Sequence, residues 1–239
     1  RMVVGVSDVD ERRLDVRGIW EATDAVSGYL RTLAAPVPGV GSEHDGLLAM
    51  GLGVELPQLR TAIEALLRHV IAHGRECDWV DPDVIEASIP QLSLVLGPMT
   101  AGIKGFHLEI DEMSYEDFQP DAIRASLLAA VDDPRGVFAL GSMFNPALGA
   151  LEVPNDGTLV EMPRELVAGQ PTPEPRVAIK DKALLLVSGD IEQSEVDALF
   201  AAPTAEPAPL FAFDYGVAQL VELLSKLLDQ AAEQMEAQG

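Results

Sequence analysis

Apolar residues recur along this chain at two spacings, which predict two kinds of element. Alternation with polar residues predicts a strand, because successive side chains point to opposite faces of a sheet, whereas spacings of three and four predict a helix. We expect strands at 2–7, 14–22, 47–55, 103–113, 136–140, 158–162, 177–179, 183–187 and 210–215. We expect helices at 24–34, 57–73, 120–131, 191–200 and 216–236, a helical turn within 141–150, and two short helical pieces after Asp81 that Pro90 and Pro98 interrupt.

Two stretches of the chain share one order of expected elements. Residues 14–36 align with residues 181–203, so that Leu33-Ala34-Ala35-Pro36 falls on Phe200-Ala201-Ala202-Pro203. Each stretch is followed by a strand, a Gly-Val pair and a long amphipathic helix. The pattern predicts an α+β fold of antiparallel or mixed sheets with helices packed on one face, built from two related copies of a hairpin–helix–strand–long helix unit.

This repeat suggests a division of the chain. We expect a first α+β unit at 1–150, a proline-rich connection at 151–176, and a second, partial copy at 177–239 that packs on the first. The chain opens at Arg1 directly into a strand pattern, so we expect the first unit to be truncated at its N-terminus, where a signal peptide or lipid anchor could have preceded it.

Charge and composition narrow the class of protein. The 239 residues include 39 Asp and Glu against 16 Lys and Arg, a net charge of −23, which disfavours nucleic acid and anionic lipid as partners because both need cationic contacts. Cys77 is the single cysteine, so an intrachain disulfide is excluded. No apolar run approaches the roughly 20 residues that span a bilayer. We therefore expect no membrane span, no nucleic acid and no cofactor.

Two histidines on the first long helix form a candidate metal site. His69 and His73 lie four residues apart and share one helix face, and Cys77 lies four residues further on. Imidazole and thiolate are zinc ligands. The favoured interpretation is a boundary helix with two surface histidines and a partly buried cysteine, because no glutamate follows His69 as in metalloproteases and Cys77 lies beyond Gly74.

An acidic strand offers the second candidate chemistry. Glu109 and Asp111 point the same way on a strand, roughly 7 Å apart. Such a pair can hydrolyse glycosides or bind calcium, although a solvated strand face is the favoured interpretation in so acidic a chain. The sequence has no nucleophile elbow and no phosphate-binding lysine motif. We predict no catalytic residue and favour a protein that is not an enzyme, with a hydrolase or metal-binding role for this strand as the open alternative.

The C-terminal helix is the most suggestive binding element. Its wide apolar stripe includes Leu220, Leu224, Leu227 and Leu228, which we select as binding residues. The simplest interpretation is that the stripe packs on its own sheet. The alternatives are a homodimer through the long helices, or a groove for a protein partner or an apolar ligand.

Two sequence segments in the second half of the chain resemble a known class of proteins. The strand and Gly-Val of Leu210–Val217, which lead into a long helix, and the glycine-flanked strand Ala183–Gly189 resemble duplicated bacterial cell-envelope proteins of uncharacterised function. The resemblance implies a periplasmic or cell-envelope location, with the cytoplasm as the alternative, and carries over no functional residue. We therefore expect a non-enzymatic bacterial binding or protein-interaction module, or alternatively a carrier of an apolar small molecule between sheet and helices.

Overall fold

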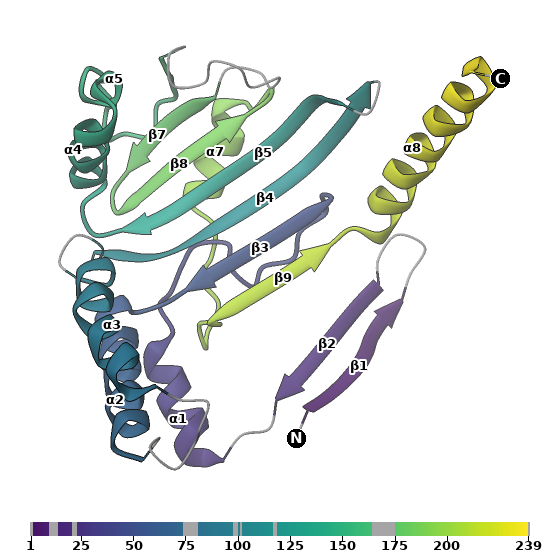
Figure 1. Ribbon diagram of the computed structural model, residues 1–239. Helices are drawn as coiled ribbons and strands as arrows, with labels where there is room; N and C mark the ends of the chain where they lie inside the picture. Colours follow the sequence, from purple (N-terminus) through teal and green to yellow (C-terminus); the bar gives the residue numbers. More distant parts are fainter. Residues whose placement is uncertain are drawn as a thin grey trace.

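A seven-stranded sheet forms the centre of the molecule. The computed structural model describes residues 2–9, 14–20, 23–73, 81–97, 100, 102–116, 119–163 and 175–238. The strand order is β6-β7-β8-β5-β4-β3-β9 and every neighbouring pair is antiparallel (Figure 1). The strands are β3 (Leu48–Gly53), β4 (Ile103–Glu116), β5 (Gln119–Val131), β6 (Val160–Glu161), β7 (Arg176–Lys180), β8 (Ala183–Ser188) and β9 (Phe211–Tyr215). A separate antiparallel hairpin consists of β1 (Met2–Val9) and β2 (Leu14–Trp20).

The helices lie around this sheet rather than between its strands. They are α1 (Asp24–Leu33), α2 (Leu56–His73), α3 (Pro82–Val95), α4 (Pro134–Phe144), α5 (Pro146–Gly149), α7 (Gln193–Phe200) and α8 (Val217–Gln238). In Figure 1, α2 and α3 pack together at one end of the sheet, α7 lies behind it, and α8 projects from the end of β9. The α+β class that the sequence predicted is confirmed.

Two predicted elements are wrong. Residues 120–131, expected as a helix, form most of β5, and residues 136–140, expected as a strand, lie within α4. Both faces of β5 carry apolar residues, so its sequence lacks the alternation that identifies a strand with one polar face. The start of α4 is marked by Asp133, whose side chain accepts a hydrogen bond from the Gly136 N–H.

Pro90 does not divide α3. The helix runs without a break over Pro82–Val95 and begins at Asp81, whose carboxylate accepts hydrogen bonds from the N–H groups of Asp83 and Val84. A proline inside a helix leaves the carbonyl four residues earlier, that of Glu86, without its usual donor. Both Pro90 and Glu86 are exposed, so water can satisfy that carbonyl.

The two stretches of the predicted repeat have the same order of elements. Hairpin β1–β2, α1, β3 and α2 follow one another in the first, and β7–β8, α7, β9 and α8 in the second. β3 and β9 are neighbours, so the single sheet takes strands from both stretches. Common origin stays a prediction, because element order alone does not compare the two backbones.

The sheet has two faces of different composition. On the face that we call the covered face, Leu128, Leu185 and Val187 pack against Val196 of α7 and against Val37 and Val40, which precede β3. The same face becomes small or polar towards β9. Its cross-strand rows are Gly53–Gly105–Ala130–Ala183–Lys180, Ala212–Gly51–His107–Leu128–Leu185–Ala178, and Asp214–Ala49–Glu109–Ser126–Val187–Arg176.

Candidate functional site

The opposite side of the sheet, which we call the open face, is almost entirely apolar. Its rows are Phe211–Leu52–Phe106–Ala129–Leu184–Ile179, Phe213–Met50–Leu108–Leu127–Leu186–Val177, and Tyr215–Leu48–Ile110–Ala125–Ser188. At the β7 end Val177 and Ile179 are buried, and Ile179 lines a cavity together with residues of α4 and α5. The side chains from β9 to β8 lie outside the buried core, and Phe211 and Phe213 are 57% and 54% exposed. Figure 1 shows α7 behind the sheet and no described element in front of β3, β4 and β5. Large exposed apolar surfaces of this kind mark interaction sites.

The predicted binding residues of α8 fall into two groups. Leu220 and Leu227 are half-buried, whereas Leu224 and Leu228 are 49% and 70% exposed. The half-buried side of the helix contacts β4: Leu227 lines a cavity of about 250 Å³ together with Met113 and Tyr115 of that strand. The Gln230 side chain also donates a hydrogen bond to the Tyr115 carbonyl, at 2.9 Å.

The exposed side of α8 carries a regular apolar row, which we call the α8 seam. Its members are Val221, Leu224, Leu228 and Met235, which are exposed, and Ala231, which is half-buried. They alternate at spacings of three and four residues, the pattern of a helix that packs on another surface along its whole length. The seam therefore has the form of a docking surface, and within the described residues nothing covers its leucines.

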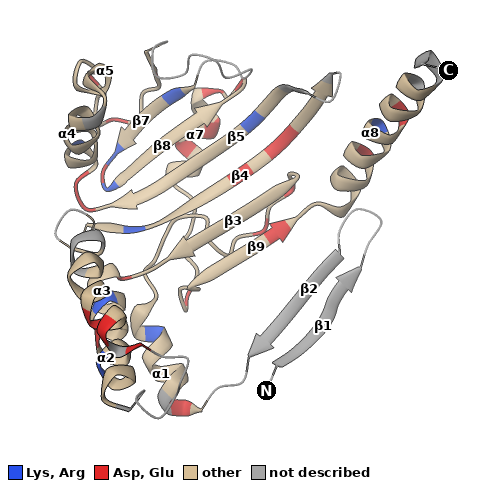
Figure 2. Ribbon diagram, viewed as in Figure 1, with Lys and Arg blue, Asp and Glu red and all other residues tan. Residues whose placement is uncertain are grey.

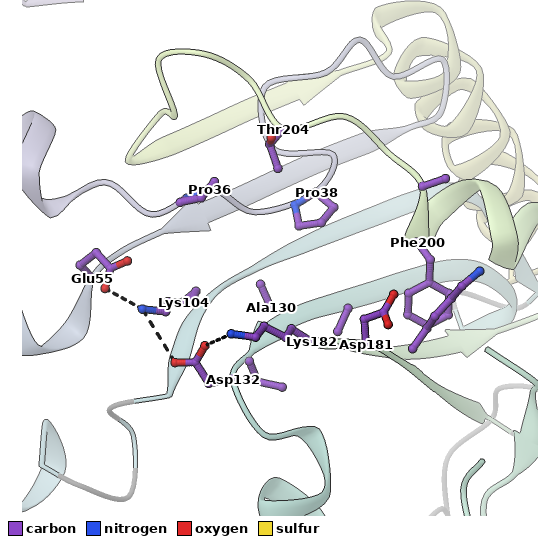
Figure 3. Close-up of a pocket in the computed structure, with 14 residues that line it drawn as sticks. Pro36, Pro38, Glu55, Lys104, Ala130, Asp132, Asp181, Lys182, Phe200 and Thr204 are labelled. Atoms are coloured by element: carbon purple, nitrogen blue, oxygen red, sulfur yellow. Dashed lines mark hydrogen bonds and ion pairs between the residues drawn. The ribbon is translucent and has the colours of Figure 1, made fainter. Parts of the chain in front are cut away.

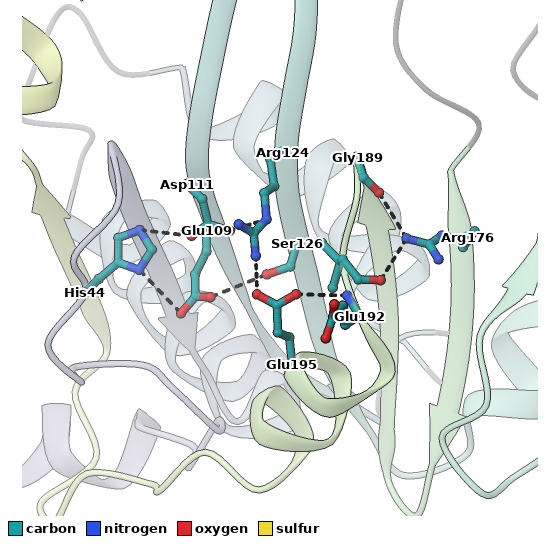
Figure 4. Close-up of polar contacts among 10 residues, drawn as sticks. His44, Glu109, Asp111, Arg124, Ser126, Arg176, Gly189, Glu192 and Glu195 are labelled. Carbon is teal, nitrogen blue, oxygen red and sulfur yellow. Dashed lines mark hydrogen bonds and ion pairs between the residues drawn. The ribbon is translucent and has the colours of Figure 1, made fainter. Parts of the chain in front are cut away.

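A partly buried polar cluster lies on the covered face (Figure 4). The His44 ring, carried by the segment before β3, faces two carboxylates of β4: Nδ1 is 3.8 Å from Glu109 Oε1, and Nε2 is 3.9 Å from Asp111 Oδ1. His107 Nδ1 lies 3.6 Å from Glu109 Oε1. The solvated strand face favoured from the sequence is wrong for Glu109, which is half-buried because the loop that carries His44 covers its carboxylate, whereas the Asp111 side chain is 33% exposed.

Glycines let this loop approach the sheet. Gly39 has φ of +81°, and a Cβ there would collide with the His107 ring. A Cβ at Gly46 would collide with the His44 ring. The two imidazoles therefore lie where a larger residue in the loop would displace them.

The second carboxylate of the cluster connects to β5 and α7. Arg124 Nε lies 3.7 Å from Asp111 Oδ2, and the same guanidinium makes an ion pair with Glu195. Figure 2 shows the acidic segment of β4 beside the basic position of β5. Ser126 Oγ lies 3.5 Å from the Glu109 carboxylate. The charges thus continue from β4 to α7 as one network.

Burial determines the ionisation of two members of the cluster. It lowers the pKa of His107 to about 4, helped by the nearby charge of His44, so His107 is neutral at pH 7. Burial raises the pKa of Glu109, which the neighbouring Asp111 also raises, while His44 and the Ser126 hydroxyl oppose the shift. An ionised Glu109 without a compensating positive charge is therefore unfavourable at this partly buried position.

Sequence reasoning found Glu109 and Asp111 but missed the histidines. His107, Glu109 and Asp111 alternate along the strand, which is a signal that could have added His107. His44 gave no such signal. The predicted pair on α2 remains untested: His69 is exposed on that helix, and the His73 side chain and Cys77 lie outside the described residues.

A cavity at the other end of the covered face is bordered by paired charges (Figure 3). It has a volume of about 560 Å³, and both halves of the predicted repeat line it, through Pro36 and Phe200. Lys104 Nζ contacts Glu55 at 2.8 Å, and Glu55 raises the pKa of that lysine. Asp132 pairs with Lys182 at 3.1 Å. Because these charged side chains are already paired with one another, we propose no binding site at this cavity.

Comparisons with known proteins give this chain no family. No protein-family model matches it, and neither a curated protein nor a solved structure shows significant similarity. Within the described residues, no helix combines the length and the hydropathy that a bilayer-spanning segment needs.

Proposed function

We propose that this chain is a protein-interaction module whose partner is a second copy of itself, with the α8 seam of each copy on the open face of the other. One observation carries the proposal: the same chain exposes an apolar helix seam and an apolar sheet face. A two-fold dimer uses the same surfaces on both copies, so one exchange would cover both seams and both faces.

The dimensions of the two surfaces agree. The seam extends over 14 residue steps from Val221 to Met235, about 21 Å at 1.5 Å per residue. The open face crosses five strands, and four strand spacings of about 4.8 Å give about 19 Å. A helix on a sheet is also the packing that α7 adopts on the covered face.

The acidity of the chain does not oppose this contact. In heptad terms the seam occupies positions a and d, and the positions beside it are uncharged: Ala218, Leu220, Ser225, Leu227, Ala232 and Gln234. The three rows of the open face contain no charged residue. Long-range repulsion between two acidic copies is screened over about 8 Å at physiological ionic strength.

Sedimentation of a matched pair of variants tests the dimer. We expect the unmodified chain to sediment as a dimer and Leu228→Glu to sediment as a monomer, because a charge would be buried in the interface. The control is Leu66→Glu on α2, an exposed leucine of similar accessibility, 60% against 70%, which should leave the dimer intact. A monomeric unmodified chain, or equal sensitivity of both variants, contradicts the proposal.

Cysteine pairing tests the arrangement within the dimer. In a Cys77→Ser background, chains with Leu228→Cys mixed with chains carrying Leu108→Cys should form a disulfide between the seam of one copy and the open face of the other. Disulfides that form only between two copies of Leu228→Cys indicate seam-on-seam packing and overturn the exchange.

The open face favours a second candidate, a carrier of an apolar small molecule. Phe106, Phe211 and Phe213 give this face an aromatic side next to the β9 edge, and apolar ligand sites are lined by such residues. The probe is the fluorescent fatty acid cis-parinaric acid, added to the Leu228→Glu monomer. A carrier should enhance its fluorescence, and Phe213→Ser should reduce that enhancement. No enhancement contradicts the carrier and leaves the dimer unaffected.

For the location we propose the periplasm or cell envelope, on the resemblance of Leu210–Val217 and Ala183–Gly189 to envelope proteins. Fractionation of the producing cells tests it, and recovery of the chain with cytoplasmic markers contradicts it.

A further inference from the structure

We infer that His44, Glu109 and Asp111 form a binding site for a divalent transition-metal ion, with Zn²⁺ as the probe. One nitrogen of His44 and one oxygen of each carboxylate lie within 4.8 Å of one another. Imidazole nitrogen and carboxylate oxygen are the ligands that zinc combines in three-ligand sites with an open position. The site is independent of the dimer, because it lies on the covered face.

The unsatisfied nitrogen of His44 points to a ligand. The His44 side chain is 9% exposed, and its Nε2 is buried with no hydrogen-bond partner among the residues that the structure describes. Buried polar atoms in folded proteins are almost always hydrogen-bonded or bound to an ion. This nitrogen faces Asp111 Oδ1 across 3.9 Å, which is too long for a hydrogen bond (Figure 4). The nitrogen therefore has the environment of a metal ligand that is aimed at the carboxylates.

The separation fits a metal ion between the two atoms. Zinc bonds to nitrogen and carboxylate oxygen are about 2.0 to 2.2 Å long, so one ion can reach both Nε2 and Oδ1 across 3.9 Å, and a tetrahedral angle at the ion requires the two atoms to move about 0.5 Å closer. The second carboxylate, Glu109, lies 3.8 Å from the other ring nitrogen, Nδ1, and one of its oxygens is within 4.8 Å of the other two ligand atoms of the set.

The carboxylates around His44 favour the binding of a cation. The cluster contains three carboxylates, Glu109, Asp111 and Glu195, and one guanidinium, that of Arg124, which pairs with Asp111 and Glu195. The carboxylates therefore outnumber the guanidinium, and a divalent cation would reduce their mutual repulsion. Arg124 and Ser126 contact the carboxylates from the side of β5 and hold them in place, as outer-shell residues do around metal ions.

An access route leads to the site. Asp111 is about one-third exposed and lines a cavity of about 690 Å³ between the far ends of β4 and β5 and the first turns of α8. An ion can enter through this cavity and reach Asp111 first. The same opening leaves room for a water molecule as a further ligand.

Calorimetric titration of the full chain with Zn²⁺ tests the site. We expect one ion per chain, and His44→Ala and Asp111→Asn should each weaken binding by more than about tenfold, the least that loss of an outer-shell contact costs. The control is His69→Ala on α2, which removes an exposed histidine and should leave binding unchanged. Absence of binding to the unmodified chain, or equal loss in His69→Ala, overturns the site.

A second measurement keeps the test valid if a variant fails to fold. X-ray absorption at the zinc edge of the unmodified chain should show nitrogen and oxygen ligands with a single imidazole. A sulfur ligand would identify Cys77, and two or more imidazoles would indicate a different ligand set; either result overturns the assignment.

Discussion

The two faces of the central sheet use the same strands for opposite purposes. On the covered face, small residues such as Gly51 and Ala49 let the segment before β3 approach the sheet, and the apolar half packs against α7. On the open face the same strands present Met50 and Leu52 to solvent. The difference shows that apolar content does not decide which face of a sheet becomes the core. The core forms where the rest of the chain supplies a cover.

Two neighbouring leucines on β8 should show the largest difference in stability between the two faces. Leu185 is fully buried on the covered face, and Leu186 is half-buried on the open face. Leu185→Ala should lower the free energy of unfolding by about 3 kcal/mol, because it leaves a cavity in a packed core, and Leu186→Ala by about 1 kcal/mol. Urea unfolding in the Leu228→Glu background, where self-association is removed, measures both. Equal costs would mean that the open face is covered within one copy.

A smaller difference in the free energy of unfolding is expected between two substitutions on β3, one on each face. A Cβ at Gly51 would collide with the Val40 side chain, so Gly51→Val should lower the free energy of unfolding by about 2 kcal/mol. The neighbouring substitution Met50→Val on the open face only removes volume from a half-buried side chain and should cost less than about 1 kcal/mol. Thermal unfolding of the two variants compares them. A tolerated Gly51→Val would show that the loop is not held against the sheet.

The smallest expected difference in the free energy of unfolding is between variants of two leucines on α8. Leu227 contacts β4, whereas Leu224 belongs to the exposed seam. In the Leu228→Glu monomer, Leu227→Ala should lower the free energy of unfolding by about 1 kcal/mol, and Leu224→Ala by less than about 0.5 kcal/mol, since little of its surface is buried within one copy. Chemical denaturation followed by circular dichroism measures both. A larger cost for Leu224→Ala would place the seam against the chain's own body.

Local patterns predicted many elements of the fold. Periodicity located α2 and α8, and the expected hairpin over 177–188 is confirmed as β7 and β8. The error at 120–131 has a physical reason. This segment is rich in alanine and leucine, which favour helices, and both faces of β5 are apolar, so pairing with β4 and β8 decided against the local preference.

For the candidate sites too, local patterns predicted some residues, and only tertiary contacts brought the others to them. Alternation placed Glu109 and Asp111 on one strand face, but it could not place His44, which reaches them only because the loop before β3 folds over the sheet. Likewise, helical spacing identified the leucine stripe of α8, while its docking on β4 decided that Leu224 and Leu228 are exposed and Leu220 and Leu227 half-buried. A residue's own neighbours in sequence do not contain this information.

By itself, the sequence determined the acidic character of the protein, the α+β class, the course of its longest helices and the stripe that α8 carries. These properties follow from composition and from spacings of a few residues. Contacts in the tertiary structure decided that β5 is a strand, that one face of the sheet stays open from β9 to β5, and that His44 meets the carboxylates of β4. Each of these depends on contacts between segments far apart in the chain, whose free energies outweigh local preference.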